Sequence, residues 1–295
     1  MTDDVGDLPK KSAVPVRFPP RFSGKCTGQV CSLSRFFLGG PGPLAKTGQT
    51  WPERAMRHWV AAILFGACAP VAWAGEVTLA VASNFVTTAE EIAAAFETET
   101  GHEIVLAHGS TGQIFSQVVS GAPFDVFLSA DAERPAKIVE TGRAKAARTY
   151  ALGRLVLVST VPVTRESALE AMTGKTVALA DPTVAPYGKA AISAMEGLKL
   201  DTATFRPVLV SNVGQVASIF ATGNAEFAFV SVSQLPLLFA PHALVLEGLY
   251  PDIRQDAALL DGPGDDEAVA AFWSWLFSPR AAEIIGPAGY GVPAE

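Results

Sequence analysis

Short apolar runs alternate with amphipathic stretches along most of the chain after residue 76. In 87–101, Ala89, Ile92, Ala93 and Phe96 follow the i, i+3, i+4, i+7 spacing of a helix with one buried face. The first series places strands at 77–83, 103–107, 124–130 and 154–160, with helices at 87–101, 112–121 and 132–142. A second series places strands at 175–181, 205–211 and 225–232, with helices at 187–198 and 214–223. Repeated β-α-β units predict parallel sheets covered by helices on both faces.

Each series has the size of one small lobe, and the chain then adds a strand at 252–260 and helices at 265–277 and 279–286. We therefore predict an α/β fold of two lobes with mostly parallel sheets. The predicted crossings between the lobes lie near Gly153–Ser159 and Glu247–Ala257. Lobe 1 is assigned to residues 75–154 and 250–295, and lobe 2 to residues 155–249.

The N-terminal part of the chain has a different character. Residues 1–55 are rich in Pro and Gly without a sustained period, which indicates a disordered extension or a wrongly assigned start. Residues 56–74 have the order of a secretory signal peptide: Arg57, an apolar stretch from Trp59, and the small-x-small site Ala72-Trp73-Ala74. We expect cleavage near Ala74 and a periplasmic protein. Lipid attachment at Cys68 is the alternative, although Phe65 fits that signal poorly.

Charge narrows the classes of partner. Residues 75–295 hold 13 Lys and Arg against 25 Asp and Glu, a net charge of −12. A nucleic-acid partner is excluded because phosphate neutralisation needs clustered basic side chains. All three cysteines precede residue 75, so the body has no thiol, which suits an oxidising compartment.

Polar residues gather where predicted strands lead into helices. The four junctions are Ser83-Asn84, the segment 109–112, the segment 181–188 and the segment 211–214. A helix N-terminus has unpaired backbone N–H groups and a partial positive charge, so converging termini form an anion site. Only Lys189 brings a cation to these junctions. The simpler interpretation is that Ser110 and Asn212 are helix N-caps, a role compatible with binding.

Other chemistry fits the pattern less well. An exported hydrolase with Ser110 as nucleophile is the alternative, but a nucleophile elbow needs Gly-x-Ser-x-Gly and His108 occupies the first glycine position. We interpret His108 as a packed or rim histidine. His102 and His242 lack zinc-ligand spacing, and the acidic run at 265–267 is interpreted as the favourable start of a helix.

Taken in order, "VASNF", "GSTGQI", "GAPFDVFLSAD", "DPTVAPYGKAA", "SNVGQV" and "PRAAEIIGPAGYG" resemble the periplasmic molybdate-binding proteins of ABC transporters, across residues 75–295. The resemblance implies a type II binding-protein fold that closes around molybdate or tungstate, with no enzymatic activity and no cofactor. It also implies a monomer that delivers the oxyanion to a membrane permease. A sulfate- or phosphate-binding relative is the alternative of the same class.

The resemblance also implies the ligand-binding residues. They are Ser83, Asn84, Ser110, Tyr187 and the backbone N–H of Val213. Ser231 stands where many members have a ligand-contacting tyrosine, and the tyrosine of the turn, Tyr187, is expected to replace it. Thr111 is interpreted as the cap of the helix that follows Ser110.

Overall fold

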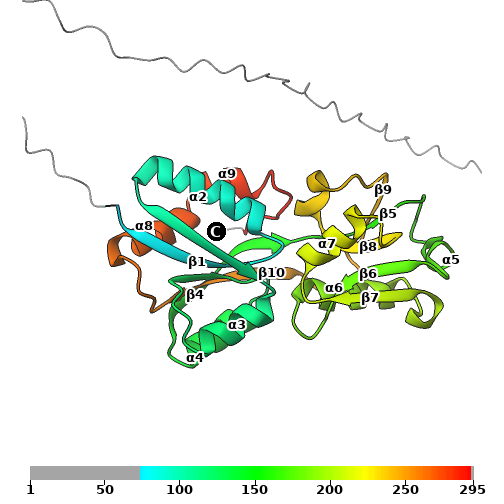
Figure 1. Ribbon diagram of the computed structural model, residues 1–295, viewed down its shortest axis with the longest axis horizontal. Helices are drawn as coiled ribbons and strands as arrows, with labels where there is room; N and C mark the ends of the chain where they lie inside the picture. Colours follow the sequence, from blue (N-terminus) through cyan, green and yellow to red (C-terminus); the bar gives the residue numbers. More distant parts are fainter. Residues whose placement is uncertain (1–73, 294–295) are drawn as a thin grey trace, which may run out of the picture. The chain divides into compact units, whose positions relative to one another are not determined.

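The computed structural model describes residues 74–293. The predicted extension (1–55), nearly all of the predicted signal peptide (56–74) and the three cysteines lie outside the described residues. Two five-stranded sheets form the body, each with its own helices (Figure 1). We call the sheet that contains the first strand, with its helices, lobe 1, and the other lobe 2.

Lobe 1 has the strand order β2-β1-β3-β10-β4. Its strands are β1 (Glu76–Ala82), β2 (Glu103–Gly109), β3 (Val126–Leu128), β4 (Ala144–Gly153) and β10 (Ile253–Leu260). Its helices are α2 (Val86–Thr100), α3 (Thr111–Val119), α4 (Glu133–Glu140), α8 (Asp266–Leu276) and α9 (Pro279–Ile285). Along β1, Leu79 packs with Phe96 and Phe272 on one face, whereas Ala80 packs with Ile114 and Ile138 on the other. Both faces of this sheet are therefore buried, as the apolar runs predict.

Lobe 2 has the strand order β7-β6-β8-β5-β9. Its strands are β5 (Leu155–Ser159), β6 (Thr176–Ala180), β7 (Arg206–Val210), β8 (Phe227–Ser231) and β9 (His242–Val245). It carries α5 (Ala168–Met172), α6 (Pro186–Gly197), α7 (Val213–Ala221) and two 3₁₀ segments, η1 (Thr202–Thr204) and η2 (Val232–Leu237). The chain crosses between the lobes twice, from β4 to β5 and from β9 to β10.

The predicted two-lobed α/β fold is confirmed, but the sheets are mixed rather than mostly parallel. In each sheet two strand pairings are parallel and two are antiparallel. The prediction missed the edge strands β4 and β9, which both pair antiparallel. Each has one exposed side for much of its length, so neither shows the continuous apolar run of a strand buried on both faces.

Helix ends follow the sequence signals only in part. Thr87 and Glu90 have the spacing of a capping box, but α2 begins at Val86 after Phe85 and has no side-chain cap. Gly101 ends the helix in the left-handed conformation, with φ 77°, as its glycine predicts. At α8 the acidic run starts the helix as expected, because Asp265 accepts hydrogen bonds from the backbone N–H groups of Glu267 and Ala268.

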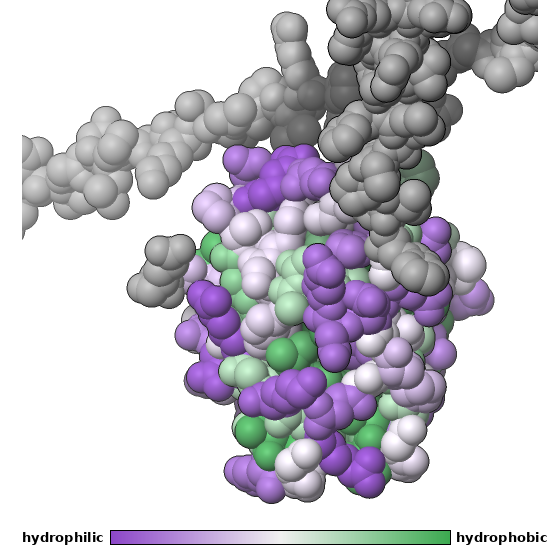
Figure 2. Space-filling view, turned by 90° about the vertical axis from the view of Figure 1, so that its left-hand side faces the viewer, coloured by the Kyte–Doolittle hydropathy of each residue, from purple (hydrophilic) through white to green (hydrophobic). Residues whose placement is uncertain are grey.

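Two properties of residues 74–293 bear on the class of protein. No helix in this range is both long and apolar enough to span a membrane. Nor does this range bring three or more His, Cys, Asp or Glu side chains together as a possible metal site. On the face shown in Figure 2, hydrophilic residues are interspersed with scattered hydrophobic patches.

Candidate functional site

A small cavity lies between the two lobes, where strands end and helices begin. Its volume is about 190 Å³, including the part that opens to solvent. Both lobes contribute to its wall: Ala82, Ser83, Asn84, Ser110, Thr111, Ala130, Ala185, Pro186, Tyr187, Asn212 and Val213. The structure thus brings all five predicted site residues together. No charged side chain is among these described wall residues.

Ser110 is held at this cavity by the first turn of α3. Its Oγ accepts a hydrogen bond from the backbone N–H of Gln113 at 3.2 Å, and Gln113 Oε1 accepts one from the backbone N–H of Ser110 at 3.3 Å. This is a capping box, so Ser110 and not Thr111 caps the helix. Thr111 is already helical, and its Oγ1 accepts from the backbone N–H of Ala130. Because the Ser110 hydroxyl serves as an acceptor here, its proton is available to a solute in the cavity.

Val213 is the first residue of α7, so its backbone N–H has no acceptor within the helix. Asn212 caps the same helix, with its Oδ1 accepting from the backbone N–H of Gln215 at 3.0 Å. Asn212 is therefore the N-cap that its sequence position predicts. The side chain of Asn212 bonds to Gln215, so it does not occupy the N–H of Val213, and both residues line the cavity.

Tyr187 enters the cavity from the first turn of α6, directly after Pro186. The helix can approach the end of β6 only because residue 188 is glycine: a Cβ there would lie 2.3 Å from the carbonyl oxygen of Ala180. The Tyr187 hydroxyl lies 3.0 Å from Ser231 Oγ. Burial is the main cause that raises the pKa of Tyr187 well above its ordinary value, and the neighbouring Tyr290 is the second cause. The phenol is therefore protonated and can donate a hydrogen bond.

Asn84 lies in the turn after β1 with its amide group already engaged. Its Nδ2 donates to Gln255 Oε1 at 3.2 Å and to the Tyr290 hydroxyl at 3.1 Å. Both amide hydrogens are used by these contacts, so a donor from Asn84 to a solute has to be its backbone N–H. The carbonyl oxygen of Asn84 accepts from Tyr290 and from Ser233 of lobe 2. The neighbouring Ser83 is held by a hydrogen bond from its N–H to the carbonyl oxygen of Gly109.

The sequence interpretation missed a buried polar group behind the cavity. Gln255 of β10, Tyr150 of β4 and Tyr290 near the C-terminus connect Asn84 to Tyr187 through hydrogen bonds. Gln255 is completely buried. A glutamine and an aspartate in the middle of the apolar strand 252–260 were the one visible signal, because a buried polar side chain needs partners.

Two ion pairs lie near the cleft, and none of their residues is among those of the cavity wall. Lys189, the one cation at the four junctions, has its Nζ 3.5 Å from Glu133 across the lobes. Arg134 pairs with Asp131 and donates to the carbonyl oxygen of Thr183 at 3.2 Å. The cavity is therefore surrounded by neutral donors and helix termini.

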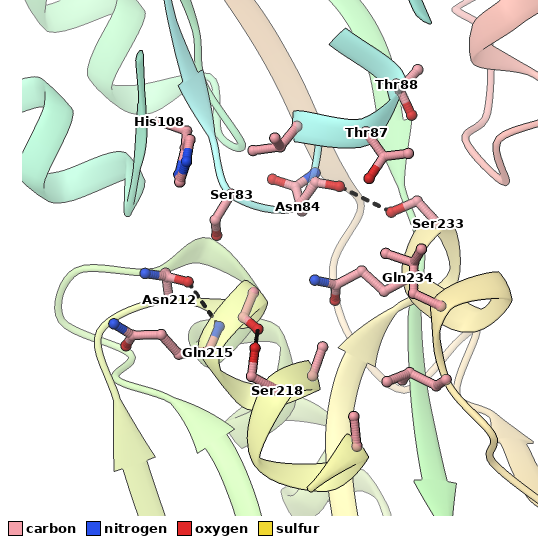
Figure 3. A pocket seen from close by; sticks show the side chains of 16 residues that line it. Ser83, Asn84, Thr87, Thr88, His108, Asn212, Gln215, Ser218, Ser233 and Gln234 are labelled. Atoms are coloured by element: carbon pink, nitrogen blue, oxygen red, sulfur yellow. Dashed lines mark hydrogen bonds between the residues drawn. The ribbon is translucent and has the colours of Figure 1, made fainter. Parts of the chain in front are cut away.

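A wider groove continues from the cavity along the interface of the lobes, past Ser83, His108, Asn212 and Ser233 (Figure 3). His108 is exposed at the end of β2, a rim position as interpreted from the sequence. Among the described contacts, His108 makes no hydrogen bond to Ser110, whose Oγ is occupied by the Gln113 N–H. This arrangement lacks the base that a serine nucleophile needs.

The chain matches known proteins over most of its length. Residues 77–291 match the family model described as bacterial extracellular solute-binding protein. The molybdate-binding protein ModA of Rhodobacter capsulatus is 44% identical over 236 residues, covering 78% of this chain and 93% of the relative. ModA of Azotobacter vinelandii is 39% identical over 248 residues, covering 81% of this chain and 98% of the relative.

A solved structure, the periplasmic molybdate-binding protein of Azotobacter vinelandii, superposes with a TM-score of 0.69 at 33% identity. It covers 74% of this chain and all of the solved chain. The expectations of a binding-protein fold and of a protein without enzymatic activity are confirmed, and the hydrolase alternative is set aside. The chain belongs to the bacterial extracellular solute-binding proteins, as a homologue of the ModA proteins.

Proposed function

We propose that this protein captures molybdate, and tungstate as a close chemical analogue, in the cavity between its lobes. One observation carries the proposal: Ser83, Asn84, Ser110, Tyr187 and Val213, from both lobes, line one small cavity without a charged side chain. The names of the relatives that cover most of the chain agree with this ligand.

The donors suit a small dianion that carries no proton. Hydroxyl protons come from Ser110 and Tyr187, with Ser83 as a third, and backbone N–H groups come from Asn84 and Val213. Hydrogen bonds to a charged oxygen contribute about 1.5–3 kcal/mol each. The N-termini of α3 and α7 add partial positive charge at the same place. A buried dianion is thereby compensated without a formal cation.

Selectivity would follow from geometry and from the absence of an acceptor. We expect the fixed donors of the cavity to match molybdate, the larger oxyanion, so sulfate should make poorer hydrogen bonds and bind much more weakly. A hydrogen phosphate carries a proton that needs an acceptor, and no carboxylate is among the described residues of the cavity wall. Phosphate is therefore also expected to bind weakly.

The proposal also covers the export of the protein, its oligomeric state and the delivery of its ligand. The family is extracellular, and we propose that residues 56–74 direct export, with cleavage near Ala74 and without lipid attachment at Cys68. We propose that the protein works as a monomer and passes its ligand to the membrane permease of an ABC transporter. Two lobes that close around the ligand would give the permease a surface that differs between the loaded and empty protein.

Calorimetric titration with molybdate, tungstate, sulfate and phosphate tests the proposal. We expect tight binding of the first two and much weaker binding of the others. A thousandfold excess over the Kd stabilises the native state by about 4 kcal/mol, so the melting temperature should rise with molybdate. Equal affinity for sulfate would move the protein to the sulfate-binding class, and an unchanged melting temperature at millimolar molybdate would contradict oxyanion capture.

A further inference from the structure

Gln255 forms hydrogen bonds to two residues of the proposed site, Asn84 of lobe 1 and Tyr187 of lobe 2. We propose that Gln255 is a positioning residue that orients Tyr187 and Asn84 toward the ligand and stabilises the closed protein, an inference that rests on the proposed function. It lies in β10, directly after the second crossing between the lobes, and does not line the cavity itself. It therefore acts through its neighbours.

Each end of the Gln255 amide contacts a different lobe. Its Oε1 accepts from Asn84 Nδ2 at 3.2 Å and from the Tyr150 hydroxyl at 3.0 Å, both in lobe 1. Its Nε2 donates to the Tyr187 hydroxyl of lobe 2 at 3.2 Å. A carboxylate or a hydrocarbon side chain at this position cannot supply both an acceptor and a donor.

The direction of these bonds determines what Tyr187 can do. Because its oxygen accepts from Gln255, the single hydroxyl proton of Tyr187 is left to be donated, to Ser231 or to a bound oxyanion. Without Gln255 the phenol could rotate or turn its proton away from the cavity. In the closed protein Gln255 thus presents Tyr187 as a donor to the ligand.

A glycine at the first crossing makes room for this contact. A Cβ on Gly153 would lie 2.5 Å from Gln255 Nε2 and 2.5 Å from the Tyr187 hydroxyl oxygen. Real Cβ atoms do not approach other atoms so closely, so with any side chain at this position at least one of the neighbouring groups would have to shift. Glycine at residue 153, the last position of β4, therefore leaves room for the hydrogen bond between Gln255 and Tyr187.

The contact to Tyr187 crosses between the lobes, so it exists only while they are closed. If the lobes separate, Gln255 keeps its partners Asn84 and Tyr150 and loses Tyr187. Loss of this hydrogen bond should therefore accelerate release of the ligand more than it slows association. A residue needed only for folding of lobe 1 would instead lower the melting temperature of the unliganded protein without this kinetic signature.

The test compares Gln255→Met, Tyr187→Phe and the double variant, with Thr149→Val as a control. Thr149 donates to buried Asp256 within lobe 1 and takes no part in the cavity. Equilibrium binding and stopped-flow kinetics of molybdate are measured for each, together with the melting temperature without ligand. Binding of molybdate by the unaltered protein tests the proposed function separately.

We expect Gln255→Met to raise the Kd roughly tenfold, mainly through faster dissociation, about the loss of one hydrogen bond. In the Tyr187→Phe background the same change should cost clearly less, because the partner hydroxyl is already gone. Thr149→Val should leave the dissociation rate unchanged. Additive effects of the two substitutions, or a Gln255→Met protein that releases molybdate at the unaltered rate, would overturn the role of Gln255 even if the protein binds molybdate well.

Discussion

Single residues at the cavity serve local structure and the proposed ligand at once. Ser110 accepts from Gln113 to cap α3 and still has its own proton to donate. In Asn84 the side chain serves local structure and the backbone is left for the ligand. Its amide group donates to Gln255 and Tyr290, so its backbone N–H is the donor that remains for a solute. The identity of a residue at a strand-to-helix junction therefore does not say which of its groups faces the cavity.

Removing the Ser110 hydroxyl should weaken oxyanion binding by about 1.5–3 kcal/mol, because a donor to a charged oxygen is lost. Ser110→Ala also removes the cap, worth about 1 kcal/mol of stability, whereas Ser110→Gly costs only a few tenths. Both variants should bind molybdate roughly tenfold to a hundredfold more weakly in calorimetry, with Ser110→Gly closer to the unaltered melting temperature. Ser116→Ala, on the exposed side of α3, is the control. Unaltered affinity in both Ser110 variants would contradict its assignment.

Buried tyrosines should make the protein sensitive to strong base. Burial raises the pKa of Tyr290 to about 12, and the pKa values of Tyr150 and Tyr187 are also raised by burial. Above about pH 10 the unfolded chain releases these protons and the folded chain keeps them, so the unfolding free energy falls as pH rises from about 10 to about 12. Below pH 10 this effect is absent.

Urea unfolding at several pH values measures this loss, which should be about 1 kcal/mol per pH unit for each tyrosine in that window. Tyr290→Phe removes one titrating group, so its stability should fall less steeply with pH. If the unfolding free energy falls equally steeply with pH in the variant and in the unaltered protein, burial does not keep Tyr290 protonated above pH 10.

At the scale of elements, helix starts decide where donors point. The helices α3, α7 and α8 all begin with a side chain that accepts from the first turn, namely Ser110, Asn212 and Asp265. The first two lie at the cavity, and the third is remote from it. The same local device thus caps all three helices, and only the first two caps lie where they line the cavity or precede a residue that does.

Asp265 offers a test of capping that is independent of the ligand. Asp265→Ala removes both hydrogen bonds to the first turn of α8 and should lower the unfolding free energy by about 1 kcal/mol. Asp266→Ala is the matched control, since it also removes one acidic residue from the first turn but leaves the capping carboxylate in place. Denaturant unfolding compares them, and equal losses would assign the effect to charge instead of the cap.

Residues 124–131, from one of the motifs that carry the family resemblance, mainly stabilise lobe 1. The Asp125 carboxylate accepts from the backbone N–H groups of Thr78 and Gly264, both at 2.7 Å. The Tyr150 hydroxyl oxygen lies 3.1 Å from the carbonyl oxygen of Ser129, and Asp131 pairs with Arg134. Of this segment only Ala130 lines the cavity. This motif therefore contributes mainly to the structure of lobe 1, whereas the motif at 181–191 contains the cavity residue Tyr187.

For the whole body, contacts on both sides of the cavity hold the lobes together. On one side the backbone N–H of Gly112 donates to the carbonyl oxygen of Val184 at 2.9 Å, and Arg134 reaches Thr183. On the other side Ser233 donates to the carbonyl oxygen of Asn84. We interpret this arrangement as a closed form, which a ligand that contacts both lobes would favour.

We therefore expect the protein to open without ligand and close on molybdate. X-ray scattering in solution should show a smaller radius of gyration with saturating molybdate than without it. Excess sulfate, which should occupy the site poorly, is the control for a general salt effect. Identical dimensions with and without molybdate would contradict closure.

The net charge of −12 on residues 75–295 should repel a dianion at long range. Because the cavity wall has only neutral donors, added salt screens this repulsion and hardly affects the contacts inside. Stopped-flow association with molybdate should be unchanged or modestly faster as sodium chloride rises. A steep decline would indicate attraction by cations and contradict the neutral-donor mechanism.

The sequence alone determined the alternation of strands and helices, and hence the α/β class and the two lobes. Periodicity and apolar runs are local properties, so β1, β2, β6 and β8 could be predicted, as could the polar junctions that follow strands. The resemblance to a family then selected Ser83, Asn84, Ser110, Tyr187 and Val213, which meet at one cavity. Their roles toward a ligand remain predictions.

Only the tertiary structure decided the contacts behind these residues. Asn84 meets Gln255 across 171 positions of sequence, and Gln255 meets Tyr187 across 68. No local pattern encodes such pairs, because the first depends on how β10 returns to the sheet of lobe 1 and the second on how the two lobes approach each other. The antiparallel edge strands β4 and β9 could not be predicted for a related reason. An edge strand exposes one side, so its sequence lacks a continuous apolar run, and its partner strand depends on the fold of the whole lobe.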